Sequence, residues 1–453
     1  MMPSMNPADE HPLRYTLANE LHARPSPRVQ APATVAFLAF KEPRDAAGRD
    51  RRRDFDHLAE LVARHGGQRP DPDASHYQGQ LGRHELRWES HAEFVTYAAS
   101  TPGLPPRPFD PQAGSVFPDE WQSRAPGKRI AAILMQVDVL PDDPDTIPDL
   151  LQDWFAVDSL ATSWVLDQAA VIASDFRIDQ NGWMRFAVFI RPSESAGRTG
   201  RIIQRLTELE TYRAMSMLAL ARTRSLMRRL NDVEGSLTEI VDHMSDARRP
   251  ADQLLHDLIG VASRLETEAT QHFFRFGATE AYQAIVMDRI QALRETRFQG
   301  KQSLTEFMAR RYMPAMRTVE SARHRLRDTL ERATRAGDLL RTRVDVARSA
   351  QNQKLLESMD RRADLQLRLQ HTVEGLSVVA ISYYAVGLLS YALTPLAEAV
   401  RVEKSVMVAG LVPLVVLGVW LALRRIKAGL HGPNEGQGAR HPASQATTKN
   451  EER

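Results

Sequence analysis

Two long apolar runs, at residues 376–396 and 406–423, dominate the pattern of hydrophobic and polar positions, and neither contains a charged residue. At about 1.5 Å of rise per residue, helices of these lengths span roughly 27–31 Å, close to the hydrocarbon thickness of a bilayer. The pattern therefore predicts a two-span transmembrane hairpin over residues 372–427. Two buried helices of a soluble core are the alternative.

Short apolar runs bounded by turn residues characterise the first 200 residues. Helical spacing predicts helices over residues 45–65 and 147–155, the first ended by two glycines. Seven prolines in residues 101–127 predict a long loop over the surface. The runs that indicate strands are residues 34–40, two within 84–100, 129–140, 169–178 and 183–190. We therefore predict one α/β domain with a mixed sheet over residues 1–200.

A helical period begins at residue 201. Apolar residues in steps of four and three predict a coiled-coil-like seam at Leu226, Leu230, Val233, Leu237, Ile240 and Met244. Pro250 predicts a break, and Gly277 predicts a second boundary or kink. Helical spacing then continues from Ser303, and residues 315–371 would form about 85 Å of unbroken helix. The fold class is thus α+β, with a long-helix domain over residues 201–371 and a disordered polar tail over 428–453.

Basic residues flank the apolar runs at their outer ends. They are Arg361, Arg362 and Arg368 before the first run, and Arg424, Arg425 and Lys427 after the second. The bridge between the runs balances Arg401 and Lys404 against Glu398 and Glu403. The positive-inside rule therefore predicts that both termini are cytoplasmic. The N-terminus lacks the features of a signal peptide, and the 453 residues include no cysteine, which fits a reducing compartment.

The net charge of +2 conceals a split, because residues 1–200 carry −7 and residues 201–371 carry +7. The split could support contact between the two parts or between subunits. A basic face can also attract anionic lipid or RNA, but a solvated helical surface is the commoner explanation. We expect no nucleic-acid partner. The mean hydropathy of −0.38 indicates a large soluble part with a small membrane anchor.

Common catalytic motifs are absent from the sequence. No segment matches the phosphate-loop, dinucleotide-binding, zinc-protease, serine-hydrolase or calcium-loop patterns. The absence of cysteine also excludes thiol catalysis and thiolate metal sites. We therefore expect that the chain is not an enzyme and that it holds no cofactor or metal.

Two short clusters are the best candidates for binding or chemistry in the first 200 residues. One comprises Glu20, His22 and Arg24, and the other comprises Trp88, Glu89, His91 and Glu93. In an extended chain, positions two apart share a face, so carboxylate and imidazole groups would gather there. Such a face can bind a divalent cation or orient a proton transfer. The commoner alternative is ion pairing that ties the N-terminal arm to the sheet.

Small and polar residues form a stripe within the first apolar run. Its members are Ser377, Tyr384, Gly387, Tyr391 and Thr394. In lipid, such stripes pack against another helix or face water. We expect helix packing within the hairpin or between subunits, and pore lining is the alternative.

Four segments resemble a bacterial family of uncharacterised membrane-anchored proteins. They are HPLR from His11, NELHARP from Asn19, WESHAEFVTY from Trp88 and VEGLSVVAISYY from Val373. The resemblance covers most of the chain up to about Leu430. It implies a membrane anchor, here in the bacterial inner membrane, and no particular chemistry.

The order of the parts also resembles, more weakly, that of CorA-type magnesium channels. Their Gly-Met-Asn motif at the end of the first span is absent, because Gly387 is followed by Leu388 and Leu389. The first expectation is therefore a non-enzymatic, membrane-anchored homo-oligomer whose α/β head binds a partner. A divergent CorA-type ion channel is the alternative, and an enzyme that uses the His/Glu clusters comes third.

Overall fold

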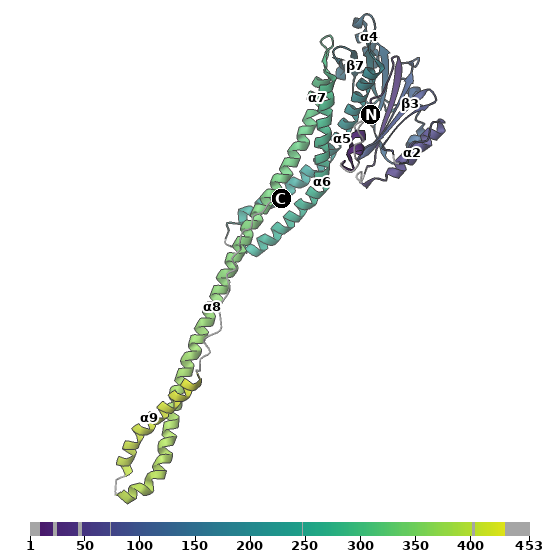
Figure 1. The fold of residues 1–453 in the computed structure, drawn as a ribbon. Coiled ribbons are helices and arrows are strands. Elements are labelled where there is room, and N and C mark those ends of the chain that lie inside the picture. The colour runs from purple at the N-terminus through teal and green to yellow at the C-terminus, as the bar shows by residue number, and fades with distance from the viewer. Residues whose placement is uncertain are drawn as a thin grey trace. The chain divides into compact units, whose positions relative to one another are not determined.

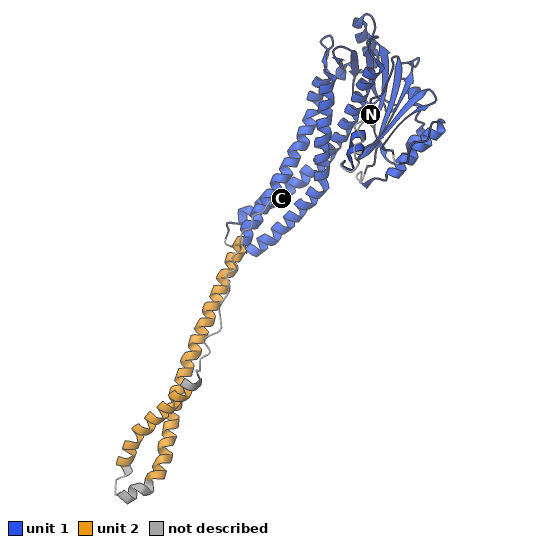
Figure 2. Ribbon diagram, in the orientation of Figure 1, with its two compact units in different colours: residues 1–341 blue, residues 342–453 orange. Residues whose placement is uncertain are grey.

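The computed structural model of the chain describes residues 10–20, 25–43, 48–72, 74–246, 248–400 and 404–430. The chain divides into two compact units, residues 1–341 and 342–453 (Figure 2). The first unit contains a sheet and several helices, and the second contains the C-terminal helices. The predicted α+β class is confirmed.

The described strands of the first unit form one mixed sheet in the order β2-β3-β4-β1-β5-β8-β7-β6-β9. Their bounds are β1 Ala33–Lys41, β2 His76–Leu81, β3 His84–Ser90, β4 Phe94–Pro102, β5 Lys128–Val139, β6 Ala161–Val165, β7 Ala170–Ser174, β8 Met184–Ile190 and β9 Thr296–Arg297. Neighbouring strands are antiparallel except for β5 and β8, which are parallel. The predicted mixed sheet is therefore confirmed.

The apolar runs of the first 200 residues coincide with β1, β3, β4, β5, β7 and β8. Gly182 adopts a positive φ in the turn that joins β7 to β8, where the Asp179 N–H donates to the Trp183 carbonyl (2.8 Å). Three strands escape the hydrophobic pattern. β2 and β9 are rich in polar residues, and β6 buries Thr162 and Ser163 among its apolar neighbours.

Both faces of the sheet are covered, which explains why all nine residues of β1 are buried. Val35 and Phe37 face a core shared with α5 (Ala196–His243), whereas Leu38 and Phe40 face a second core beneath α2 (Arg51–Arg64; Figure 1). The covering helices are α2 Arg51–Arg64, α3 Asp119–Ser123, α4 Ile147–Trp154 and α5 Ala196–His243. Alternate residues of one strand thus serve two separate cores.

The surface loop predicted over residues 101–127 is only partly correct, because most of the segment is irregular but part of it is helical and buried. This segment contains the 3₁₀ helix η3 (Pro111–Gly114) and α3, and it buries Phe117 and Trp121 in the second core. The Trp121 Nε1–H donates to the His57 carbonyl (2.9 Å). Proline is well tolerated at a helix start and in turns, so the prolines shape a covering layer over the sheet.

After α5 the chain is mostly helical, and only the short strand β9 interrupts the helices. They are the long helix α6 Ala251–Leu293, the short helix α7 Leu304–Arg311, and the long helices α8 Met313–Val400 and α9 Lys404–Leu430. The predicted break is confirmed, because α5 ends at His243 and Pro250 caps the start of α6. The boundary predicted at Gly277 is wrong, since α6 continues through it. The helix period begins at Ala196, five residues before the predicted position.

The predicted seam of α5 is used inside the chain. Leu226, Leu230, Val233, Leu237 and Ile240 are buried in a core that also contains residues of α6 and of α8 up to Leu340. The seam therefore packs the helices of the first unit against one another. Pairing of these helices between chains stays a prediction.

Two helices of the described residues are long and apolar enough to cross a membrane. The first apolar run lies within α8, which is unbroken from Met313 to Val400, as the helical pattern predicts. The second lies within α9, which contains Pro413 in its interior. In the second unit, α9 folds back along α8 as a helical hairpin (Figure 1).

Candidate functional site

A groove of about 70 Å³ lies between the sheet and α5 in the first unit. Its apolar lining includes Val35, Phe37, Phe94, Ala98 and Ile203. Its polar lining from the sheet and the β3–β4 turn includes Gln78, Glu85, Arg87, Glu89, His91, Thr96 and Ser100, and from α5 it includes Gln204, Thr207, Glu208, Thr211 and Tyr212. An apolar floor with convergent polar groups is typical of a small-ligand site.

The register of β3 and β4 explains the open space. Arg87 lies opposite Ala98, and Glu89 lies opposite Thr96. Long charged side chains on β3 thus neighbour short ones on β4, which leave room between the sheet and the helix. On α5, lining residues recur at every fourth position, as in Ile203, Thr207 and Thr211, so they share one helix face.

The segment before β1 closes one end of the groove. Pro27 and Val29 belong to the lining, and the Val29 N–H donates to the Ala196 carbonyl at the start of α5 (3.0 Å). The Pro27 carbonyl oxygen approaches Gly200 so closely that a Cβ there would lie 1.6 Å away. Glycine at position 200 therefore permits this segment to pack directly on α5.

A triad of Arg87, Glu89 and His91 lines the sheet side of the groove. The Glu89 carboxylate lies between Arg87 Nη2 (2.6 Å) and His91 Nε2 (3.5 Å). The His91 ring stacks on Phe94 with ring centroids 4.4 Å apart. Arg87 Nη2 is buried, and within the described part of the chain it makes no hydrogen bond of good geometry besides this ion pair. A ligand oxygen could therefore accept a hydrogen bond from Arg87.

The other carboxylates of the groove are held by neighbouring side chains. Glu85 Oε1 accepts a hydrogen bond from Gln78 Nε2 (2.6 Å) on β2. Glu208 accepts one from Gln204 Nε2 (2.8 Å) and forms an ion pair with Arg289 of α6. The polar walls are thus arranged before any ligand enters, which reduces the cost of ordering them on binding.

Glu93 leaves this groove and joins a second cluster. β3 ends at Ser90, so the alternation that would place Glu93 beside Glu89 and His91 stops there. Glu93 is buried and forms an ion pair with Arg275 of α6, and it accepts a hydrogen bond from the Tyr282 hydroxyl (2.9 Å). The predicted face therefore retains Glu89 and His91, while Glu93 ties the β3–β4 turn to α6.

Burial and charge perturb two groups near Glu93. Burial, together with the Arg275 guanidinium, lowers the pKa of the Lys41 ammonium. Burial and the Glu93 carboxylate raise the pKa of the Tyr282 phenol, so Tyr282 remains a hydrogen-bond donor at neutral pH. These groups form a compact tie between β1, the β3–β4 turn and α6.

The remaining predicted residues of the first unit lie elsewhere. Trp88 points to the opposite face of β3 and is buried in the second core. Glu20 is the last residue of α1 (Arg14–Glu20), and its side chain, like the whole of His22 and Arg24, lies outside the described residues. In the described part of the chain, no group of three or more His, Asp or Glu side chains is arranged to hold a metal ion.

Several residues that line the groove are not predicted as site residues from the sequence. Arg87 carries a usable signal, because Glu85, Arg87 and Glu89 alternate along one strand face. Thr207 and Glu208 carry none, because they lie more than 100 positions away and read as ordinary residues of a helical stretch. Only the packing of α5 on the sheet brings them to Arg87.

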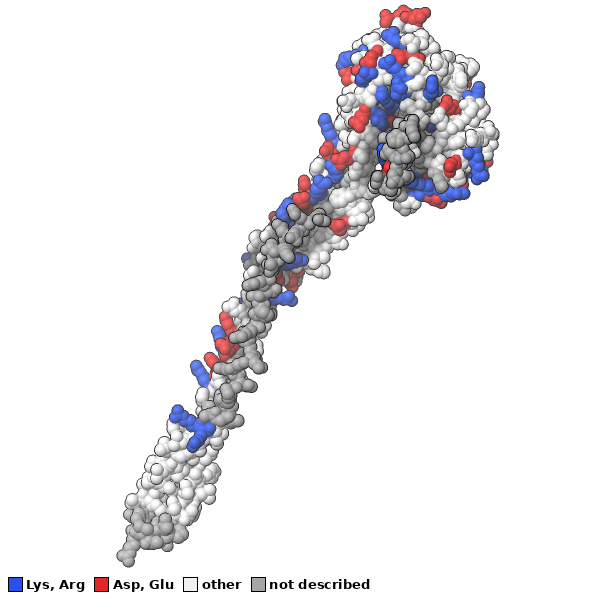
Figure 3. Space-filling model, in the orientation of Figure 1, with Lys and Arg blue, Asp and Glu red and all other residues white. Residues whose placement is uncertain are grey.

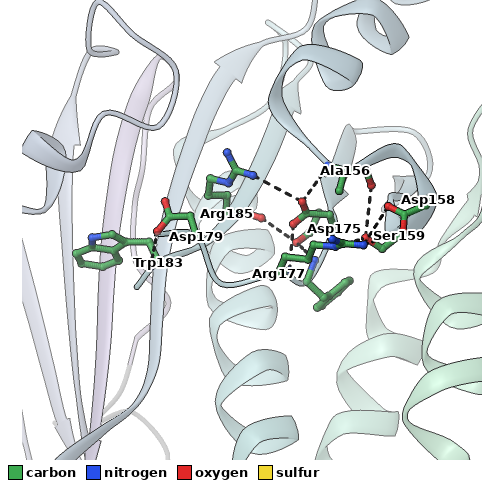
Figure 4. Close-up of polar contacts among 10 residues, drawn as sticks. Ala156, Asp158, Ser159, Asp175, Arg177, Asp179, Trp183 and Arg185 are labelled. Atoms are coloured by element: carbon green, nitrogen blue, oxygen red, sulfur yellow. Dashed lines mark hydrogen bonds and ion pairs between the residues drawn. The ribbon is translucent and has the colours of Figure 1, made fainter. Parts of the chain in front are cut away.

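A further polar cluster supports the sheet without forming a site. Figure 4 shows Arg177 and Arg185 pointing toward acidic partners around Asp175. The buried Asp175 carboxylate accepts hydrogen bonds from the Ala156 and Arg177 N–H groups (both 3.1 Å) and lies 3.6 Å from Arg185 Nη2. Arg177 in turn forms a two-oxygen contact with Asp158. Because both Asp175 oxygens are engaged, we assign this cluster a structural role.

The predicted stripe of the first apolar run does not pack within the hairpin at its tyrosines. Tyr384 is 70% exposed and Tyr391 is 80% exposed, whereas Ser382 on another face is buried. The Ser377 hydroxyl donates to the Val373 carbonyl (2.8 Å), and Gly387 has no neighbouring atom within 4 Å of an added Cβ. The Thr394 side chain lies outside the described residues. Packing of the tyrosines between subunits stays a prediction.

Comparison with known proteins places the chain in a family. No curated protein matches it. The family match gives no support to the architectural resemblance to CorA-type channels. A family model described as "Protein of unknown function (DUF3422)" matches residues 9–430, so the chain belongs to that family.

Proposed function

We propose that this chain is a non-enzymatic membrane-anchored binding protein, held in the bilayer by the α8–α9 hairpin. The observation that carries the proposal is the pair of long apolar helices. In the apolar stretch of each helix, only 6% of the residues are buried within the chain. A core helix of a soluble protein would bury such a surface. Exposed apolar helices of this length fit a lipid environment.

The outward side chains of the hairpin support the proposal. Leu388 and Leu414 are more than two-thirds exposed, one on each helix. In Figure 3, most of the described surface of this part is white, which marks residues other than Lys, Arg, Asp and Glu. These exposed apolar side chains form a belt on the hairpin. An apolar environment would remove this surface from water, which is favourable.

Charge at the hairpin's outer ends supports an orientation. Arg424 and Arg425 follow the second run, and Arg361, Arg362 and Arg368 precede the first. We propose the bacterial inner membrane as the location, with both termini in the cytoplasm. The groove of the first unit then faces the cytoplasmic solution.

The groove is the part of the first unit best suited to binding. Its apolar floor and the Arg87–Glu89–His91 triad fit a small molecule with an apolar body and one hydrogen-bond acceptor. Replacement of Thr207 by Met would fill the groove from α5. In native mass spectrometry of the purified full chain, we expect a small molecule to be retained by the unmodified protein and by the matched control Thr238→Met on an exposed face of α5. It should be lost from Thr207→Met, and equal retention by both variants would contradict the assignment.

Exposed apolar side chains on α8 support self-association. Leu355, Leu356, Met359, Leu365 and Leu369 are more than half exposed in the single chain. We infer that copies of the chain associate through this part of α8 as parallel helices, because the anchor aligns them in one membrane. Light scattering of the detergent-solubilised chain should give a mass of at least two chains, and a monomer at micromolar concentration would refute it.

The anchor can be tested with charged substitutions. A central charge costs roughly 2.5–3.5 kcal/mol on insertion scales, so Leu388→Arg with Leu414→Arg should abolish insertion. The matched control is Leu339→Arg with Val346→Arg, which are 63% and 64% exposed on α8 but lie outside the apolar runs. After alkaline carbonate washing, the unmodified chain and the control should stay in the membrane pellet, and the first variant should not. Release of the unmodified chain would refute the anchor.

A further inference from the structure

We propose that a cleft between α8 and α9 in the second unit binds the head of an anionic glycerophospholipid. The cleft has a volume of about 1160 Å³ and is lined by residues 363–378 of α8 and 420–426 of α9, where the two apolar runs meet the polar chain. The inference rests on the membrane anchor proposed above. It adds a specific ligand site to that anchor.

The cleft is lined by both apolar and polar side chains. The apolar lining includes Leu367, Leu369, Val373, Val378, Leu423 and Ile426. The polar lining includes Gln366, Gln370, Glu374, Ser377 and Arg424. A ligand that matches both parts carries acyl chains and a hydrogen-bonding head, whereas a free phosphate would leave the apolar lining uncovered.

Arg424 provides the phosphate contact. Its guanidinium lies over the Trp420 ring, 5.1 Å from the ring centroid, so a cation–π interaction limits its orientations. Among the described residues, no carboxylate forms an ion pair with Arg424, so its five N–H donors are available to phosphate oxygens. Trp420 itself is of the residue type that concentrates at membrane–water interfaces.

Glu374 limits the charge of the ligand. It is the only acidic side chain among the described lining residues, and it lies 3.6 Å from His371 Nδ1 and accepts a weak hydrogen bond from Gln370 Nε2 (3.4 Å). Its carboxylate would repel additional negative charge. A phosphodiester with one negative charge, as in phosphatidylglycerol, therefore fits the cleft better than a polyanionic head.

The neighbouring Arg425 offers a matched control. Arg425 is exposed and carries the same charge on the same helix, but it does not line the cleft. Arg424→Gln and Arg425→Gln therefore change the basic end of α9 equally and differ only in the cleft. Diffuse attraction to anionic lipid would respond to both substitutions alike.

The test is competitive lipid binding by the full chain in detergent, read by native mass spectrometry. With equimolar phosphatidylglycerol and phosphatidylcholine, the unmodified chain and Arg425→Gln should retain phosphatidylglycerol preferentially. Arg424→Gln should lose roughly tenfold or more of that preference, because one charge-assisted contact is removed. Equal loss in both variants, or no preference in the unmodified chain, would overturn the proposal. Glycerol 3-phosphate that displaces the lipid at equal concentration would overturn the assignment to lipid.

Carbonate washing of the same variants separates the two proposals. If Arg424→Gln stays in the membrane pellet and the unmodified chain shows no lipid preference, the cleft assignment fails while the anchor stands. If the unmodified chain leaves the pellet, the anchor fails, and the cleft assignment fails with it.

Discussion

Glu93 is a buried carboxylate whose stability contribution depends on its partners. Glu93→Gln would leave the Arg275 guanidinium buried without an opposite charge, which costs about 3–5 kcal/mol. Arg275→Met should cost a similar amount, and the double variant Glu93→Gln with Arg275→Met should recover much of the loss. Urea unfolding of the full chain, followed by tryptophan fluorescence, measures these differences. Additive losses in the double variant would contradict the coupling.

An exposed ion pair provides the contrast. Arg177 and Asp158 are both more than half exposed, and their pairing in solvent contributes about 0–1 kcal/mol. Asp158→Asn should therefore change the free energy of unfolding by no more than this amount. A larger loss would mean that the Asp175 cluster depends on Asp158 more than its exposure indicates.

His57 makes stability depend on pH. The Trp121 carbonyl can only accept, so His57 Nε2 carries the proton (3.0 Å) and Nδ1 accepts from the Tyr97 hydroxyl (2.9 Å). Burial lowers the pKa of His57 below the usual 6.5. The unfolded chain therefore takes up a proton first as the pH falls, and stability present above pH 6.5 is lost below it.

The measurement compares urea unfolding at pH 7.5 and pH 5.5. The unmodified chain should be less stable at the lower pH, and His57→Gln should reduce the difference. Part of the dependence should remain, because burial also lowers the pKa values of His84 and His272. An unchanged difference in His57→Gln would show that the imidazole does not titrate as its contacts require.

The positions of single side chains show which contacts can be predicted from the sequence and which cannot. Glu89 and His91 share the groove because they lie on or just beyond a strand whose alternation is visible in the sequence. Glu93 departs because β3 ends at Ser90, and a strand end shifts by a residue or two without any change in composition. Its partner Arg275 lies 182 positions away, and no local pattern reveals that contact.

Gly277 and Gly200 carry opposite predictions for the same substitution. α6 continues through Gly277, and a Cβ there would meet nothing within 4 Å, so Gly277→Ala should stabilise the chain by about 1 kcal/mol. At Gly200 an added Cβ would clash with the Pro27 carbonyl, so Gly200→Ala should destabilise it. Thermal unfolding of the two variants decides this. Destabilisation by Gly277→Ala would restore the predicted kink.

Elements with a regular apolar period are those that the sequence predicts well. β1 is apolar throughout because it is buried on both faces, and the seam of α5 is regular because one face packs on other helices. β2 and β6 are missed because their polar residues are accommodated by tertiary contacts. The proline-rich segment over residues 101–127 is predicted to lie on the surface because its composition is largely polar. It is partly buried because aromatic residues such as Phe117 and Trp121 pack in the core.

For the molecule as a whole, hydropathy predicts the two long apolar helices because each apolar run lies in one contiguous stretch of chain. The groove is different, because it requires β3, β4 and α5 to meet across distant parts of the sequence. The cleft proposed to bind lipid lies between these cases. Its apolar part follows from the spans, but the pairing of Arg424 with Trp420, four residues earlier, becomes meaningful only when α9 lies beside α8.

The absence of cysteine makes the orientation of the whole molecule directly measurable. A single cysteine introduced as Glu403→Cys reports the bridge, and one introduced as Ser245→Cys reports the exposed end of α5. If both termini are cytoplasmic, a membrane-impermeant maleimide should label only Glu403→Cys in intact bacterial spheroplasts. Lysis should then expose Ser245→Cys. The reverse pattern would invert the orientation, and labelling of both in intact cells would contradict a two-span anchor, because two spans with cytoplasmic termini place the bridge and the first unit on opposite sides.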